Sequence, residues 1–240
     1  MITYKQLTDK TMPPEKKRTA SRCVVGHYLV RPISNIVSIP LIEKKVNPTS
    51  VTKISLLFAI IPFPAFIYGG NVGFWIGWLS IFVWNVLDGV DGNIARFNNQ
   101  CSKNGELWDA FVGWVAVISF YVGMGFTAFY QNGNWNFTAD IPMYFYIFMG
   151  DMAAMSCIFP RLVMQKKRNL LGDDSVSSVQ DRGNYGFVKL VVFNLTSING
   201  MAAVLFLLAY LTGFSRVCMI LYVALTSVIA LGSLIKLMKK

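Results

Sequence analysis

Six apolar segments fix the class of protein that this chain forms. Each is long enough, at roughly 20 residues, for a helix to cross the hydrocarbon core of a bilayer. The segments cover about residues 51–69, 72–90, 107–130, 141–164, 186–212 and 214–235. Hydrophobic residues make up 54% of the 240-residue chain and charged residues only 14%, which differs strongly from the composition of soluble domains. The sequence therefore predicts an all-α, polytopic membrane protein with six transmembrane helices.

The Lys and Arg residues indicate how these spans are oriented. They gather in the first 50 residues, in the loops after the second and fourth spans, and at the C-terminus, whereas the other loops contain only Arg216. Because cytoplasmic loops carry the excess of basic residues, we expect both termini in the cytoplasm. The net charge of +10 then reflects topology and attraction to anionic lipid headgroups, and no nucleic-acid partner is expected.

The region before the first span does not have the pattern of a removable signal peptide. Over residues 24–45, apolar side chains recur at roughly helical spacing, so we expect an amphipathic helix in the cytoplasmic interface. The chain is thereby divided into a cytoplasmic N-terminal tail, residues 1–23, and a membrane domain, residues 24–240. Arg31, in the interfacial segment, has two open interpretations: it faces a binding pocket, or it pairs with a lipid phosphate.

Three aspartates interrupt the apolar pattern near the junction of the second and third spans. Asp88 and Asp91 are three residues apart and share one face of a helix, and Asp109 lies near the start of the next span. Carboxylates at membrane depth are costly unless they are paired or coordinating, and a divalent cation would also relieve their mutual repulsion. Oxygen ligands favour Mg²⁺, Mn²⁺ or Ca²⁺. With one histidine and four scattered cysteines, a zinc site and a disulfide framework are excluded.

The same helical face carries small residues and an arginine. We expect Gly89, Gly92 and Ala95 to clear space beside the acids. Arg96 supplies a positive fork suited to phosphate oxygens. Carboxylates, a metal ion, an arginine and cleared space together are typical of a site for a pyrophosphate group.

Residues 88–109 resemble the signature of the CDP-alcohol phosphotransferase (CDP-alcohol phosphatidyltransferase) family, D-x2-D-G-x2-A-R followed after seven to nine residues by G-x3-D-x3-D. Seven of the eight signature positions are matched, by Asp88, Asp91, Gly92, Ala95, Arg96, Gly105 and Asp109. The six-helix core and interfacial helix of that family agree with the layout predicted above. The resemblance implies that an acceptor alcohol displaces CMP from a CDP-activated donor, with Mg²⁺ or Mn²⁺ as cofactor, in a homodimer.

The resemblance also implies a role for each matched residue. The metal ligands would be Asp88, Asp91 and Asp109, and Asp109 would also be a catalytic residue. The substrate-binding residues would be Gly92, Ala95, Arg96 and Gly105, with Gly92 and Ala95 making room for the cytidine nucleotide and Arg96 near its phosphates.

Gly113 stands where the family has its fourth aspartate, the proposed base for the acceptor's proton. Several alternatives remain open. Asp151, in the fourth span, either replaces that aspartate as base or acceptor ligand, or makes a hydrogen bond between helices. His27 reaches the site only if the interfacial helix folds over it, and metal-bound hydroxide or a substrate phosphate is another possible proton acceptor. Arg161 either binds an acceptor phosphate or belongs to the basic flank of the fourth span.

Two classes of function follow from these patterns. The first is an integral membrane transferase of phospholipid or related lipid and glycan synthesis. Its donor is either CDP-diacylglycerol or a CDP-linked polar alcohol, and its acceptor is a lipid or a small polar alcohol. The second class lacks this activity: a relative impaired at Gly113 that serves as a binding protein, or a transporter with an intramembrane cation site. Transporters place polar groups near mid-bilayer, whereas these acids cluster at cytoplasmic helix ends, so the sequence favours a transferase with its active site at the cytoplasmic face.

Overall fold

The computed structural model describes residues 2–131, 138, 140–172 and 185–238. Its described part is helical without any strand, which confirms the predicted all-α class. In chain order the helices are α1 (Tyr4–Thr11), α2 (Pro14–Ala20), the π-helix η1 (Gly26–Val30), α3 (Arg31–Glu43), α4 (Pro48–Ile60), α5 (Pro62–Tyr68), α6 (Gly70–Phe97), α7 (Lys103–Tyr130), α8 (Tyr144–Leu171), α10 (Phe187–Thr196), the π-helix η5 (Ile198–Ala202), α11 (Ala203–Leu211) and α12 (Ser215–Met238).

Five helical segments of the described chain are long and apolar enough to cross a membrane. They are the pair α4–α5, followed by α6, α7, α8 and α12. A sixth span results if α10 and the continuous segment η5–α11 are counted together across a bend of 64°. These six spans follow the six predicted apolar segments in order, so the predicted polytopic membrane architecture is confirmed. The bend in the fifth span was not predicted.

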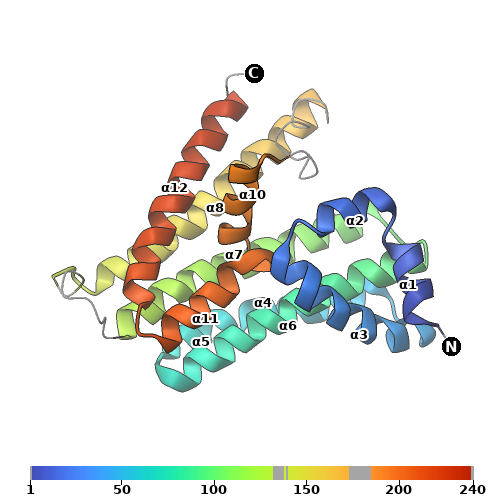
Figure 1. The fold of residues 1–240 in the computed structure, drawn as a ribbon, viewed down its shortest axis with the longest axis horizontal. Helices are drawn as coiled ribbons and strands as arrows, with labels where there is room; N and C mark the ends of the chain where they lie inside the picture. Colours follow the sequence, from blue (N-terminus) through green and yellow to red (C-terminus); the bar gives the residue numbers. More distant parts are fainter. Residues whose placement is uncertain (1, 132–137, 139, 173–184, 239–240) are drawn as a thin grey trace.

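Helix α7 lies at the centre of the bundle. It packs against α4, α5, α6, α8 and α12, and more of its apolar length is buried than that of any other span in the described chain. In Figure 1, α8 and α12 run side by side and project away from the N-terminal helices. Most of the apolar surface of these two helices is left uncovered, so in a bilayer it faces lipid or another subunit.

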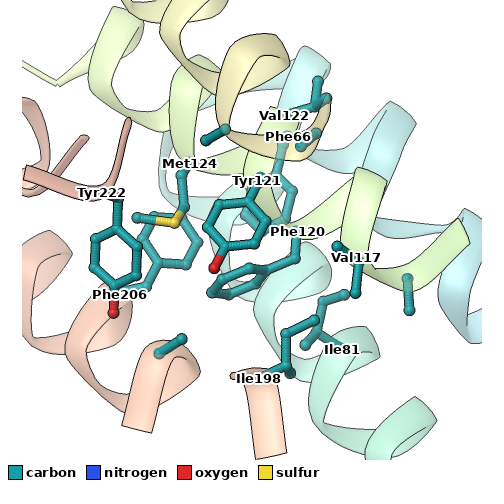
Figure 2. Close-up of a cluster of buried hydrophobic side chains, with 14 of the residues drawn as sticks. Phe66, Ile81, Val117, Phe120, Tyr121, Val122, Met124, Ile198, Phe206 and Tyr222 are labelled. Carbon is teal, nitrogen blue, oxygen red and sulfur yellow. The ribbon is translucent and has the colours of Figure 1, made fainter. Parts of the chain in front are cut away.

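An aromatic cluster fills the interior between α5, α6, α7 and α11 (Figure 2). The ring centroid of Phe206 lies 5.8 Å from that of Phe66, 5.4 Å from that of Phe74 and 5.5 Å from that of Phe120. These tilted and edge-to-face arrangements are the ones that aromatic pairs prefer. The cluster therefore ties the first, second, third and fifth spans to one another.

A second apolar cluster joins the N-terminal helices to one end of α6. Leu7 of α1, Val30 of η1 and Ile42 of α3 are buried there together with Val90 and Ile94 of α6. The segment predicted as a separate tail thus contains two helices, of which α1 packs on α3 and α6. The N-terminal region is thereby held against the end of the second span.

A close approach between α7 and α8 leads to a prediction about stability. A Cβ added at Gly150 would lie 2.8 Å from the carbonyl oxygen of Tyr121 and 3.0 Å from the Cα of Gly125. These are backbone atoms, so Gly150→Val should cost at least the roughly 1–3 kcal/mol typical of overpacking. We expect the melting temperature of the purified protein in detergent to fall.

Gly232→Ala is the matched control, because no atom lies within 4 Å of a Cβ added at Gly232. That variant should melt at the temperature of the wild-type protein or higher. Equal melting temperatures for Gly150→Val and Gly232→Ala would contradict the packing of α7 against α8 described above.

Candidate active site

A cavity of about 640 Å³ opens where α6 ends and α7 begins. Residues of η1, α3, the first turns of α4 and the bend at η5 complete its wall. All the matched signature residues lie in this wall: Asp88, Asp91, Gly92, Ala95, Arg96, Gly105 and Asp109. Two helices therefore combine their halves of the signature into one site.

The three aspartates form one acidic cluster in the cavity. The carboxyl groups of Asp88 on α6 and Asp109 on α7 meet within hydrogen-bonding contact, and both lie close enough to Asp91 for their charges to interact. Asp91 is only 6% exposed, and the hydroxyl of Thr52 on α4 donates a 2.6 Å hydrogen bond to its Oδ2. Carboxylates this close repel one another when ionised. A bound cation would therefore stabilise the cluster.

The donor set of the cluster fits a hard divalent cation. Within the described residues, no three His, Cys, Asp or Glu side chains already stand in the arrangement of a metal site, and the carboxyl of Asp91 is turned toward Thr52. The available groups are nevertheless carboxylate and hydroxyl oxygens, which Mg²⁺ and Mn²⁺ prefer. An ion between Asp88 and Asp109 would also relieve their repulsion. Asp88, Asp91 and Asp109 are therefore the residues that would hold such an ion.

The glycines beside the acids make room for protein groups. A Cβ at Gly92 would lie 2.9 Å from both terminal nitrogens of Arg96, so the arginine folds back over its own helix at that position. A Cβ at Gly89 would lie 2.5 Å from the hydroxyl oxygen of Ser34, which donates a hydrogen bond to the carbonyl of Val86. The clearance that we expected for a ligand is therefore occupied by Arg96 and α3, although both glycines still line the cavity.

A buried polar network orients Arg96. Its Nη2 donates to Oδ1 of Asn93 over 3.3 Å. The Nδ2 of Asn93 in turn donates to Oδ1 of Asn35 over 2.9 Å and to the hydroxyl of Ser38 over 3.2 Å. Asn35, Ser38 and Asn93 are at most 7% exposed. Helix α3 thus determines where the arginine lies in the cavity.

The bend in the fifth span brings Asn199 into the cavity wall. Gly200 has the non-helical angles φ −83° and ψ −123°, and a Cβ there would clash with the carbonyl oxygen of Asn194. Asn194 also ties the bend to the N-terminal region, since its Nδ2 donates to the carbonyl of Arg22 and its Oδ1 accepts from the amide of Val24. The cavity wall therefore depends on contacts between distant parts of the sequence.

Side chains from three other elements satisfy the backbone carbonyls at the bend. The hydroxyl of Tyr222 on α12 donates to the carbonyl of Leu195, and that of Tyr121 on α7 donates to the carbonyl of Thr196. Figure 2 shows both tyrosines within the apolar core. The thiol of Cys23 donates to the carbonyl of Asn199. A helix can bend inside an apolar region only when its freed backbone groups find such partners.

The structure does not bring Asp151 or Arg161 to the cavity. Both occupy exposed positions on α8, and neither forms part of the cavity wall. His27 and Gly113 also lie outside the wall, and no atom lies within 4 Å of a Cβ added at Gly113. The placement of Asp151 and Arg161 therefore lends no support to their roles as replacement base and substrate contact, and both roles stay predictions.

Thr52 and Asn199 are among the polar residues of the wall that sequence reasoning missed. Thr52 carries no signal, because a threonine within an apolar span commonly bonds its own helix backbone. For Asn199 a signal existed: Ser197, Asn199 and Gly200 interrupt the apolar run of the fifth span. Such an interruption marks a discontinuous helix near a binding site.

The Thr52 hydrogen bond yields a prediction about metal affinity. Thr52→Val removes the donor that orients Asp91 while keeping the shape of the side chain. Loss of an outer-shell partner typically costs about 10- to 100-fold in metal affinity, so we expect the Mg²⁺ concentration for half-maximal binding to rise by that factor. Thr52→Ser keeps the hydroxyl and should bind Mg²⁺ like the wild-type protein. An unchanged Mg²⁺ titration for Thr52→Val would contradict the orienting role.

Comparison with known proteins agrees with the signature and the cavity. No curated protein and no solved structure matches the chain significantly. Residues 45–230, well over half of the chain, match the protein family described as CDP-alcohol phosphatidyltransferase. That family is generally dependent on a divalent metal and implies a CDP-alcohol donor and an alcohol acceptor. The chain belongs to the CDP-alcohol phosphatidyltransferase family, whose members transfer phosphate-linked groups from a CDP-alcohol.

Proposed function

We propose that this protein is an integral membrane CDP-alcohol phosphotransferase that depends on Mg²⁺ or Mn²⁺. It transfers a phosphate-linked group from CDP-diacylglycerol or a CDP-linked polar alcohol to an acceptor hydroxyl and releases CMP, in phospholipid or related lipid or glycan synthesis. The observation that carries this proposal is the convergence of all seven matched signature residues, from α6 and α7, on one cavity.

The acidic cluster and Arg96 have different roles in the proposed reaction. Asp88, Asp91 and Asp109 hold the metal ion, which when bound neutralises the pyrophosphate and the charge that develops in phosphoryl transfer. The acceptor oxygen forms a bond to the distal phosphorus, the bond from that phosphorus to the bridging oxygen breaks, and the bridging oxygen leaves with CMP. Asp109 accepts the proton of the acceptor hydroxyl, and Arg96 binds a phosphate oxygen.

The placement of the protein in the cell is part of the proposal. Basic residues flank the end of α6, the start of α7 and both termini, which supports termini and an active site on the cytoplasmic face. The uncovered apolar faces of α8 and α12 support a homodimer in the bilayer. A binding protein without turnover is the second candidate, and Gly113, which brings no carboxylate after Asp109, is the observation that favours it.

Measurement of CMP release distinguishes a transferase from a binding protein. Purified protein in nanodiscs should release CMP from at least one donor, CDP-diacylglycerol or a water-soluble CDP-alcohol, in an acceptor-dependent way. Asp91→Asn and removal of divalent metal with a chelator should each abolish that release, because both disable the acidic cluster. Asp151→Asn, which removes an exposed acid of α8 outside the cavity, is the matched control and should retain full activity. Full activity in Asp91→Asn would rule out the metal site.

The open space at Gly113 leads to a second prediction about activity. Gly113→Asp should fold, since no atom lies within 4 Å of the added Cβ. Gly113 itself lies outside the cavity wall, but it is one turn after Asp109 on the same face of α7. An added carboxylate there would supply a proton acceptor next to the acidic cluster, and general bases contribute about 10²- to 10⁴-fold to rates. We therefore expect faster CMP release at saturating substrate. Gly113→Ala, the control for the added side chain, should match the wild-type rate, and a slower Gly113→Asp variant would show that Asp109 already meets the need for a base.

A further inference from the structure

Arg31 is a cavity residue that lies outside the family signature. It occupies the first position of α3, directly after the π-helix η1, and its half-buried side chain lines the same cavity as the acidic cluster. The structure therefore favours the first of the two interpretations that the sequence left open for this residue. Arg31 lies within the electrostatic reach of Asp88 and of Arg96. Two guanidinium groups from two different helices thus share the cavity with the carboxylates.

The positive charge of Arg31 is partly removed from water. Burial lowers the pKa of its guanidinium, an effect that Cys23 and Asp88 oppose, but an arginine remains protonated in proteins. A charge that is partly desolvated is favourable only with a partner of opposite sign. Within the described part of the chain, neither Arg31 nor Arg96 forms an ion pair with a carboxylate.

The guanidinium groups of Arg31 and Arg96 also have few hydrogen-bond acceptors in the protein. Nη1 of Arg31 donates to the thioether sulfur of Met12, which is a weak acceptor. Arg96 has the bond to Asn93 described above, and its buried Nε finds no acceptor in the described chain. Each guanidinium carries five donors in a planar fork, so most of this capacity remains for a ligand in the cavity.

A phosphate group satisfies these observations together. It carries the opposite charge, it offers several acceptor oxygens, and it suits bidentate contact with a guanidinium. It would also lie in the cavity that Asp88 lines, within electrostatic reach of both arginines. An uncharged ligand would leave the two like charges unpaired.

We propose that Arg31 is a second phosphate-binding residue of this cavity, which holds one phosphate group of a substrate together with Arg96. The inference rests on the proposed function only for the source of that phosphate, which is either the pyrophosphate of a cytidine donor or the phosphate of a phosphorylated acceptor. Both sources share the same chemistry. The binding measurement below separates them.

The test measures binding to the full-length protein in nanodiscs with Mg²⁺ by calorimetry. The probes are CDP, CMP, cytidine, inorganic pyrophosphate and glycerol 3-phosphate, and the variant is Arg31→Gln. Charge-assisted bidentate contacts are the strong class of hydrogen bond, so the affinity for at least one phosphate probe should fall by about 10- to 100-fold. Cytidine affinity should not change. Lys44→Gln removes an equal charge from an exposed position at the end of α3, outside the cavity, and should bind every probe like the wild-type protein.

The probe whose affinity falls in Arg31→Gln identifies the source of the phosphate. Weaker binding of CDP and pyrophosphate in Arg31→Gln assigns the residue to the donor, and weaker binding of glycerol 3-phosphate assigns it to the acceptor. Unchanged affinity for all phosphate probes would overturn the proposal. Met12→Leu separates binding from the packing of α1, because it removes the sulfur but keeps Arg31. If Met12→Leu lost phosphate affinity as strongly as Arg31→Gln, the effect would belong to α1 and the proposal would fall.

The proposed function can fail independently of this inference. Binding of pyrophosphate that depends on Arg31, without CMP release from any donor, would leave the phosphate site in place and refute the transferase. Acceptor-dependent CMP release, together with a phosphate affinity that is unchanged in Arg31→Gln, would support the transferase and refute the phosphate-binding role of Arg31.

Discussion

Mutual repulsion among Asp88, Asp91 and Asp109 is the interaction on which the rest of this structure depends. Three carboxylates close together at the end of two apolar spans are unfavourable without compensation. The fold supplies the hydroxyl of Thr52, which binds Asp91, and places two guanidinium groups in the same cavity. The metal ion and the phosphate group proposed above would complete this balance of charge.

Helix α3 supports this balance from outside the signature segment. It carries Arg31 at its first position, and through Asn35 and Ser38 it holds the asparagine that orients Arg96. Both arginines therefore depend on one interfacial helix that is packed against α6. The N-terminal region therefore helps to build the cavity.

The fold was largely predictable because apolar length is a local property of the sequence. Each span could be located from about 20 consecutive residues, and the spacing of Asp88, Asp91 and Asp109 was enough to expect that they converge. The contribution of Thr52 was not predictable, because it depends on which helix packs beside Asp91. The exposed position of Asp151, outside the cavity wall, was not predictable for the same reason, since a sequence does not reveal whether the face of a helix is covered. The use of the space beside Gly92 was also not predictable, because the side chain that fills it belongs to Arg96 on the same helix.

The bend in the fifth span has a consequence for how this site is built. The carbonyls of Leu195, Thr196 and Asn199 bind to side chains from α12, α7 and the N-terminal region. The shape of this span therefore depends on its neighbours as well as on its own residues. Two of the three donors are tyrosines that belong to the apolar core. The packing of the core therefore helps to determine the position of one wall of the cavity. Repacking among those aromatic rings would therefore be transmitted to the position of Asn199.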